Sequence, residues 1–176
     1  MKTETTLSRP VRIVVIGAGN RAHKYLEYAR RNPEQLRLAA IVEVNDLRRR
    51  AMADAFGLPD KYCYAHYDDF FAERLDADMV LISTPENAHF DPAVKAIDAG
   101  YHVLLEKPIA QRLDECREIA RCARRRGVLV GVCHVLRYHP YFAKIRELVA
   151  SGRLGHVVSV NHTASVGLDR ATHSYV

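Results

Sequence analysis

The chain has 176 residues, of which 48% are hydrophobic and 27% are charged, and its formal net charge is +5. This composition is typical of a globular protein and excludes fibrous and intrinsically disordered classes. No apolar run approaches the roughly 20 residues that a membrane span needs, and the first residues lack the apolar stretch of a secretory signal. We therefore expect a cytoplasmic protein without a membrane partner, with one complete domain and the start of a second.

The four cysteines and two arginine clusters are not interpreted as metal or nucleic-acid sites. The cysteines contain no C-x-x-C pair, so we expect free thiols that pack as small hydrophobic residues, and no metal. Arginines cluster at 48–50 and 124–126, inside stretches of helical periodicity without interleaved aromatic residues. Because nothing there could stack on bases, we interpret both clusters as solvated helix faces and expect no nucleic acid.

From residue 11 onward, short β-branched segments alternate with longer amphipathic segments. This alternation is typical of strand-helix units around a parallel sheet. We predict strands at 11–17, 36–44, 62–65, 77–85, 101–108 and 128–133, and helices at 20–31, 46–57, 68–72, 89–100 and 113–127. Asn45 is a predicted helix cap, and Gly57 and Gly127 are predicted helix ends. The predicted fold class is α/β, with a Rossmann-type doubly wound parallel sheet.

The pattern changes near residue 131. Residues 139–155 have the apolar spacing of a helix, and residues 156–166 alternate like a strand with one wet face. A single strand without a partner cannot form a stable sheet. We therefore predict a first domain over 1–130 and, over 131–176, the truncated start of an α/β C-terminal domain. The unpaired edge at 156–164 is expected to promote self-association.

The segment GAGNRA at 17–22 fits the G-x-G-x-x-G/A pattern between the first predicted strand and the first predicted helix. Gly17 would permit the tight turn, and Gly19 would let a pyrophosphate approach the backbone. The helix amino end, at Asn20 and Arg21, supplies N–H groups and a positive dipole end. We predict that the domain at 1–130 binds a dinucleotide here; a merely structural glycine turn is the alternative.

Glu43 ends the second predicted strand, 24 positions after Gly19. An acidic side chain at this place can accept hydrogen bonds from the adenosine ribose, and it would repel a 2'-phosphate. The sequence therefore favours NAD as the cofactor. Arg48 and Arg49 lie close enough to reach a phosphate, so NADP stays open, as does a solvent-exposed strand-end role for Glu43.

Polar residues follow the fourth predicted strand in the segment STPENAH. Ligands of open α/β sheets bind at the carboxyl ends of the strands. We predict that this segment contacts the ribose and phosphates of the cofactor, although Asn87 or His89 could instead cap the next helix. The predicted cofactor-binding residues of the segment are Ser83, Thr84, Pro85, Asn87 and His89.

Glu106 and Lys107 end the neighbouring fifth strand and are expected at the same crevice. A lysine beside a bound nicotinamide could hold a substrate hydroxyl and, if partly desolvated, move its proton. Glu106 could orient Lys107 or contact the nicotinamide ribose. An ordinary surface turn that reads Glu-Lys-Pro is the alternative.

Three segments in order, GAGNRA, TPENAH at 84–89 and AGYHVLLEKPIA at 99–110, resemble the Gfo/Idh/MocA oxidoreductase family of glucose-fructose oxidoreductase and inositol dehydrogenase. Residues 127–162 are similar to the family's crossover into its C-terminal domain. The resemblance implies that Lys107 is the active-site lysine, Glu106 its cofactor-contacting partner, and Pro108 a turn-shaping proline. It also implies reversible oxidation of a sugar or polyol hydroxyl, with the hydride passing to the nicotinamide and the proton leaving through Lys107 or a partner.

The crossover adds candidates that depend on this resemblance. Arg137 and Tyr138 fall where the family brings residues toward the nicotinamide pocket, and Arg137 is a predicted cofactor-binding residue. His134 is a weaker candidate, because a histidine at a strand end is more often a core or hinge residue.

This sequence is much shorter than members of that family. Their second domain supplies the substrate pocket, a second catalytic residue and most of the oligomer interface. We therefore expect a truncated chain that keeps cofactor binding and loses turnover, and a full-length protein that is a homo-oligomer acting on a small carbohydrate-like molecule. The alternative function is a non-catalytic NAD-binding or scaffold module.

Overall fold

A computed structural model describes residues 8–163 and 165. The chain divides into two compact units between His134 and Val135, a few residues after the boundary expected from the sequence. We describe each unit by itself.

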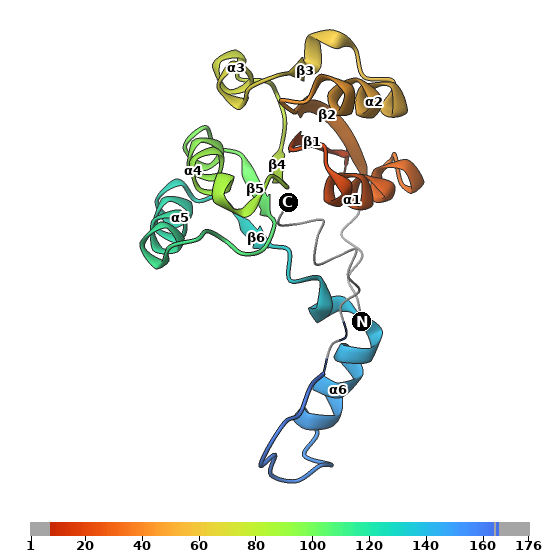
Figure 1. Ribbon diagram of the computed structural model, residues 1–176, viewed down its shortest axis with the longest axis vertical. Helices are drawn as coiled ribbons and strands as arrows, with labels where there is room; N and C mark the ends of the chain where they lie inside the picture. Colours follow the sequence, from red (N-terminus) through yellow and green to blue (C-terminus); the bar gives the residue numbers. More distant parts are fainter. Residues whose placement is uncertain (1–7, 164, 166–176) are drawn as a thin grey trace. The chain divides into compact units, whose positions relative to one another are not determined.

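The first unit is a parallel sheet of six strands whose connections contain helices. The strands are β1 (Val11–Ile16), β2 (Leu36–Val42), β3 (Cys63–Tyr64), β4 (Met79–Ile82), β5 (His102–Leu105) and β6 (Val130–Val132). The helices are α1 (Asn20–Arg31), α2 (Asp46–Phe56), α3 (Tyr67–Glu73), α4 (Phe90–Asp98) and α5 (Leu113–Arg126), with short 3-10 turns η1 (Asp60–Tyr62) and η2 (Glu86–Ala88). The strand order β3-β2-β1-β4-β5-β6 confirms the predicted doubly wound Rossmann-type sheet (Figure 1).

Local sequence signals explain where several helices begin and end. The Asn45 side chain accepts a hydrogen bond from the Arg48 backbone N–H at 3.0 Å, so it caps α2 as predicted. Gly57 and Gly127 end α2 and α5 with φ values of 61° and 69°. This left-handed conformation suits a residue without Cβ.

Alternate residues of each strand pack on opposite faces of the sheet. On β1, Val14 and Ile16 belong to the core beneath α3, α4 and α5, whereas Ile13 and Val15 belong to the core beneath α1 and α2. Figure 1 shows α1 and α2 on one side of the strands and α4 and α5 on the other. Burial on both faces explains why these strands read as continuous apolar runs.

The carboxyl ends of five strands lie side by side. Ile16 of β1 pairs with Val42 of β2 and with Ile82 of β4. Ile82 pairs in turn with Leu105 of β5, which pairs with Val132 of β6. Each of these residues is the last of its strand, so the five following loops begin at one edge of the sheet.

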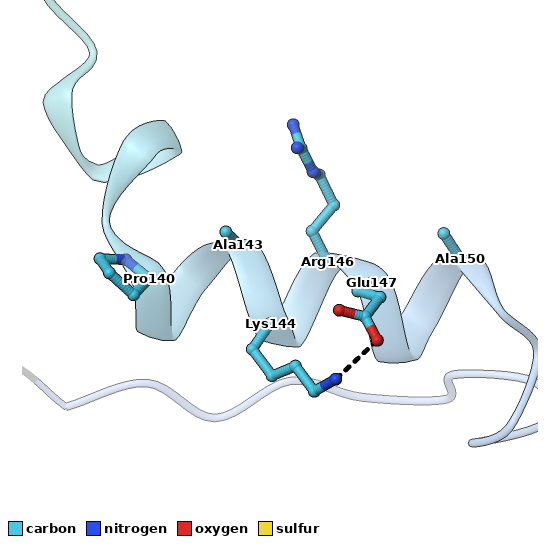
Figure 2. A pocket seen from close by; sticks show the side chains of 6 residues that line it. All are labelled: Pro140, Ala143, Lys144, Arg146, Glu147 and Ala150. Carbon is cyan, nitrogen blue, oxygen red and sulfur yellow. Dashed lines mark hydrogen bonds and ion pairs between the residues drawn. The ribbon is translucent and has the colours of Figure 1, made fainter. Parts of the chain in front are cut away.

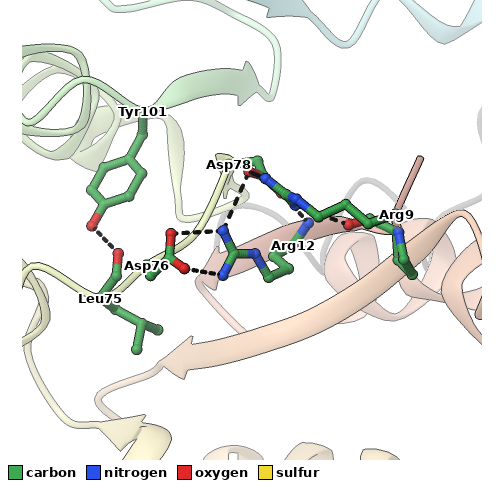
Figure 3. A network of polar contacts seen from close by, with 7 residues as sticks. Arg9, Arg12, Leu75, Asp76, Asp78 and Tyr101 are labelled. Carbon is green, nitrogen blue, oxygen red and sulfur yellow. Dashed lines mark hydrogen bonds and ion pairs between the residues drawn. The ribbon is translucent and has the colours of Figure 1, made fainter. Parts of the chain in front are cut away.

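A network of charged residues lies at the opposite end of the strands, where β1 and β4 begin (Figure 3). The Asp78 carboxylate accepts two hydrogen bonds of 2.6 Å from the Arg9 guanidinium and one of 2.7 Å from the Arg12 backbone N–H. The Arg12 guanidinium also pairs with Asp76. Because Arg12 is the second residue of β1 and Asp78 immediately precedes β4, this network joins the starts of two central strands.

Replacing Asp78 by asparagine should lower the free energy of unfolding by about 1 kcal/mol at pH 7, since solvent partly screens these pairs. The Arg9 guanidinium, helped by Arg12, holds the pKa of Asp78 below its ordinary value. A depressed carboxyl pKa stabilises the fold above the unfolded pKa of about 4, and this stabilisation is lost as the pH falls further. Urea unfolding should therefore show a difference between wild type and Asp78→Asn that shrinks below about pH 4. Asp54→Asn, on the exposed side of α2, is the control, and equal effects of both changes at pH 7 would contradict the assignment.

Some arginines of the two clusters form ion pairs within the fold, and all four cysteines are free. Arg49 and Arg50 pair with Asp46 on α2, and Arg126 of α5 pairs with Asp98. Cys63, Cys116, Cys122 and Cys133 are free thiols. Within the described residues, no helix combines the length and apolar character needed to cross a membrane.

The second unit contains η3 (Val135–Tyr138) and helix α6 (Pro140–Ala150). The His139 ring accepts a hydrogen bond from the Tyr141 backbone N–H at 3.3 Å and caps α6. Figure 2 shows that Lys144 Nζ donates to Glu147 Oε1 one turn further along α6, at 2.6 Å. This exposed pair fits the ordinary polar surface of a helix.

The strand predicted at 156–166 is wrong over the residues that can be described. Residues 156–163 have no regular secondary structure and are exposed, while 164 and 166 lie outside the described residues. Alternation of apolar residues does not by itself make a strand, because a strand requires a hydrogen-bonded partner. The self-association expected from an unpaired strand edge loses its basis.

Candidate functional site

Most of the residues predicted for a cofactor site lie along the carboxyl edge of the sheet. Five residues directly follow β2, β1, β4, β5 and β6, in that spatial order: Glu43, Gly17, Ser83, Glu106 and, not predicted, Cys133. Two of them are buried acids, Glu43 with 8% and Glu106 with 5% of its surface exposed. A buried carboxylate needs hydrogen-bond donors, so each of these two acids must have donors close to it.

The glycine loop is held against the neighbouring loop. Gly17 has a φ of 92°, and a Cβ at this position would lie 2.9 Å from the Ser83 carbonyl carbon and the Thr84 backbone nitrogen. The Ser83 hydroxyl donates to the Gly17 carbonyl oxygen at 2.7 Å. Gly17 therefore serves two needs, the predicted turn and a close approach between two loops that the sequence did not reveal.

The amino end of α1 is open. A Cβ on Gly19 would meet no atom within 4 Å, so the space beside this residue is free of protein. No side chain caps α1 and no acid lies in its first turn, whereas α2, α3, α4 and α5 each carry an acid there. The exposed Asn20 and Arg21 begin this helix. Uncompensated N–H groups and the positive dipole end make this position suited to an anion.

Glu43 is tied to two backbone segments. Its Oε2 accepts from the Ala18 N–H of the glycine loop at 2.7 Å, and its Oε1 accepts from the Asn45 N–H at 2.9 Å. The alternative of a strand-end charge in solvent is therefore wrong. Each carboxylate oxygen can accept a second hydrogen bond, so these contacts leave capacity for a ligand hydroxyl.

Arg49 is engaged within the protein. Its guanidinium donates to the Glu43 carbonyl oxygen at 2.6 Å and to Asp46 Oδ1 at 2.6 Å. Its side chain is only 16% exposed. Of the two arginines considered for a 2'-phosphate, Arg49 thus has two protein partners already, while Arg48 is exposed on α2.

In the segment after β4, some residues are exposed to solvent and others form hydrogen bonds within the protein. Pro85 and Asn87 are exposed on and beside η2, whereas the Thr84 hydroxyl donates to the Ala88 carbonyl oxygen at 3.0 Å. His89 is 1% exposed, and it precedes α4 without capping it through its side chain. Its Nδ1 lies 2.7 Å from the Pro108 carbonyl oxygen and its Nε2 lies 3.0 Å from that of Thr84.

Glu106 joins the end of β5 to helix α1. Its Oε1 accepts from the Tyr25 hydroxyl at 2.6 Å, and its Oε2 accepts from the Lys107 backbone N–H at 3.0 Å. Arg21 Nε lies 3.8 Å from the same carboxylate. Lys107 is exposed and precedes Pro108 through a cis peptide bond. The carboxylate is thus fixed, while the lysine beside it faces solvent.

Tyr25 and Cys133 belong to this cluster and were missed by sequence reasoning. Burial raises the pKa of the Tyr25 phenol, and the neighbouring Cys133 and Glu106 raise it further. Burial likewise raises the pKa of the Cys133 thiol, with a contribution from Glu106, although Tyr25 and Arg21 oppose it. Both groups therefore keep their protons near neutral pH. The available signals were the place of Cys133 directly after β6 and the spacing of Tyr25 four residues after Arg21 on α1.

The remaining candidates lie near the division between the two units. His134 is an exposed residue at the end of the first unit, and its N–H donates to the Val132 carbonyl oxygen at 2.7 Å. Arg137 and Tyr138 are exposed residues of η3 in the second unit.

Comparison with known proteins gives a consistent set of relatives. An uncharacterized oxidoreductase of Rhizobium meliloti is 32% identical over 150 residues, which are 85% of this chain and 44% of the relative. A D-xylose 1-dehydrogenase (NADP(+)) of Haloferax volcanii is 36% identical over 130 residues, 74% of this chain and 39% of the relative. The chain thus spans about two fifths of the length of these proteins.

A solved structure and a family model agree with these relatives. The crystal structure of an inositol dehydrogenase homolog from Azotobacter vinelandii, complexed with NADH and myo-inositol, is 25% identical with a TM-score of 0.74, over 86% of this chain and 42% of that one. The model of the GFO_IDH_MocA oxidoreductase family, NAD-binding Rossmann fold, matches residues 11–134. A match over most of the chain, on the sheet that carries all five aligned strand ends, shows that this protein belongs to the Gfo/Idh/MocA oxidoreductase family.

Proposed function

We propose that the chain binds NAD along the carboxyl edge of its sheet, and that the complete protein transfers a hydride between NAD and a sugar or polyol hydroxyl. The main observation behind this proposal is that the uncapped amino end of α1 follows β1 at the same end of the sheet where Glu43, Ser83 and Glu106 follow β2, β4 and β5. Membership of an NAD-binding family supports it. Residues 1–130 would form the dinucleotide-binding domain, and 131–176 would begin the substrate domain.

The pyrophosphate and adenosine half of NAD would lie at β1 and β2. The free space beside Gly19 admits a phosphate to the backbone, and the N–H groups at Asn20 and Arg21 would bind it. Glu43 would accept hydrogen bonds from the ribose hydroxyls with its remaining lone pairs. Its charge disfavours a 2'-phosphate, and Arg49 is already engaged. NAD is therefore proposed over NADP, although the Haloferax relative carries NADP in its name.

The nicotinamide half would lie near β4 and β5. Thr84, Pro85 and Asn87 would border the cofactor, and Glu106, held by Tyr25, would contact the nicotinamide ribose. NAD, when bound, supplies the hydride acceptor. Lys107, in its unprotonated form, would hold the substrate hydroxyl and accept its proton as the carbon gives up its hydride. The alcohol, NAD and the neutral amine would thus become the carbonyl compound, NADH and an ammonium group.

The substrate class is proposed from the relatives. One relative is named for D-xylose, and one structure holds myo-inositol. Both compounds are polyhydroxylated carbon skeletons, which is why we propose a small carbohydrate-like substrate. A homo-oligomer is the proposed state of the complete protein.

Isothermal titration calorimetry of the 176-residue chain tests the cofactor proposal. NADH and NAD are expected to bind at one saturable site, and NADPH at least about tenfold more weakly, which corresponds to about 1.4 kcal/mol. Absence of binding by all three nucleotides would contradict the proposal. A preference for NADPH would contradict only the assignment of NAD.

Replacing Lys107 by alanine should separate binding from chemistry. Because Lys107 is exposed and its side chain makes no ion pair with the described residues, NADH affinity should change by less than about threefold. Turnover of a polyol panel, measured in a full-length homologue with the same Glu-Lys-Pro segment, should fall by about 10²-fold to 10⁴-fold. Lys61→Ala on η1 is the binding control in this chain. A homologue without this lysine that still reduces NAD at a normal rate would remove Lys107 from the mechanism.

A further inference from the structure

His89 is enclosed between two loops of the proposed site. The ring is 1% exposed, and its two nitrogens face the backbone carbonyl oxygens of Pro108 and Thr84 at 2.7 Å and 3.0 Å. One of these loops follows β4, and the other follows β5. The imidazole is therefore a bridge between them.

The chemistry of the two partners restricts the state of the ring. A carbonyl oxygen can only accept a hydrogen bond, and a neutral imidazole has one N–H donor and one acceptor nitrogen. An unprotonated nitrogen at either distance would place a lone pair against a carbonyl lone pair. Two hydrogen bonds therefore require hydrogen on both ring nitrogens.

We propose that His89 is a doubly protonated ring that links the Thr84 and Pro108 carbonyl groups and thereby positions Lys107. A charge on this ring is unfavourable, because the ring is only 1% exposed and because the helix dipole is positive at the amino end of α4. Two charge-assisted hydrogen bonds, which are shorter and stronger than neutral ones, oppose this cost. The role assigned to Lys107 rests on the proposed function, whereas the state of the ring does not.

Charged groups on the surrounding elements either have other partners or are exposed. Asp91 on α4 accepts from Tyr67 and pairs with Lys95. Glu106 accepts from Tyr25, and Glu86 on η2 is exposed, as is Lys107. Among the described residues, the hydrogen bonds of the His89 ring thus go to backbone carbonyl groups alone.

The two contacts of the His89 ring connect two sets of hydrogen bonds around the proposed site. Pro108 follows Lys107, and the Lys107 N–H binds Glu106, which binds Tyr25 on α1. On the other side, the loop that begins at Ser83 contacts the glycine loop that precedes α1. The His89 side chain joins these two halves beyond the ends of the paired strands, where the last backbone bond between them runs from the Glu106 N–H to the Ile82 carbonyl oxygen. Its loss should therefore change the position of Lys107 and not only create a cavity.

Nitrogen-15 NMR of the histidine rings tests the protonation state directly. In the chain labelled with ¹⁵N-histidine at pH 7, one ring should show two solvent-protected N–H protons and two protonated nitrogens. The signals should be absent in His89→Gln. A His89 ring with one protonated and one unprotonated nitrogen would overturn the proposal. The measurement needs no cofactor, so it stands even if NADH does not bind.

Graded replacements test the positioning role. Glutamine retains a side-chain N–H₂ donor that can reach one carbonyl, and leucine has no donor. Because His89 also holds the loop at Thr84, which is proposed to border the cofactor, NADH affinity should fall about tenfold in His89→Gln and further in His89→Leu. His66→Gln, at the exposed residue before α3, should change it by less than about twofold. Lys107 amide shifts should move in the His89 variants and not in the control. Equal NADH affinity and unchanged Lys107 shifts in a folded His89→Leu protein would overturn this role.

Discussion

Replacing Gly17 by alanine is expected to lower the free energy of unfolding by at least about 2 kcal/mol and to abolish NADH binding. The φ of 92° is unfavourable for a residue with Cβ, and the new methyl would lie 2.9 Å from backbone atoms of Ser83 and Thr84. Backbone atoms cannot rotate away as a flexible side chain could. The glycine loop and the loop after β4 would therefore separate, as urea unfolding and calorimetry with NADH would show.

Gly19 provides the matched control for this experiment. Its φ is −81°, which any residue can adopt, and a Cβ there would meet nothing within 4 Å. Gly19→Ala should therefore change the free energy of unfolding by less than about 1 kcal/mol. NADH affinity should nevertheless fall by about tenfold or more, because the methyl would occupy the space proposed for the pyrophosphate. Unchanged affinity in Gly19→Ala would contradict that placement.

Glu43→Gln is expected to change cofactor selectivity by about tenfold or more. The substitution removes the charge that opposes a 2'-phosphate and exchanges one carboxylate oxygen for an N–H₂ group, which would face a backbone donor of Ala18 or Asn45. NADH affinity should fall while NADPH affinity holds or rises. The free energy of unfolding should also fall by about 1 kcal/mol.

Competitive titration of NADH and NADPH measures this selectivity. Glu34→Gln, an exposed acid in the loop before β2, should leave the ratio of the two affinities unchanged. An equally unchanged ratio in Glu43→Gln would mean that Glu43 only braces the glycine loop and takes no part in recognising the ribose.

Much of the fold could be predicted because its signals are local. Asn45 caps α2 by a contact within three residues, and Gly57 ends it through its own backbone conformation. The strands were also readable, because Glu43, Ser83 and Glu106 interrupt apolar runs where parallel strands finish. The predicted strands at 36–44, 77–85 and 101–108 nevertheless extend past the observed ends at Val42, Ile82 and Leu105. The strand expected at 156–166 was wrong because the alternation that predicted it is a local pattern, whereas a strand also needs a partner that is distant in the sequence.

The contacts within the site could not be read in this way, because they join distant parts of the sequence. Tyr25 reaches Glu106 across 81 positions, and Glu43 reaches Ala18 across 25. The side chain of His89 could be recognised as polar and near a helix start, but its carbonyl partners depend on how two loops fold. Sequence patterns therefore located the edge and its acids, while the structure gave their partners.

Chemical-shift mapping of NADH on the ¹⁵N-labelled chain tests the location of the proposed cofactor site most directly. The amides of Gly19, Asn20, Thr84 and Lys107 should shift saturably with one common affinity. The amide of Arg12, at the opposite edge of the sheet, should stay in place as the internal control. Saturable shifts centred on Arg12 and its neighbours, or no shifts anywhere in the chain, would contradict the proposed location of the cofactor site.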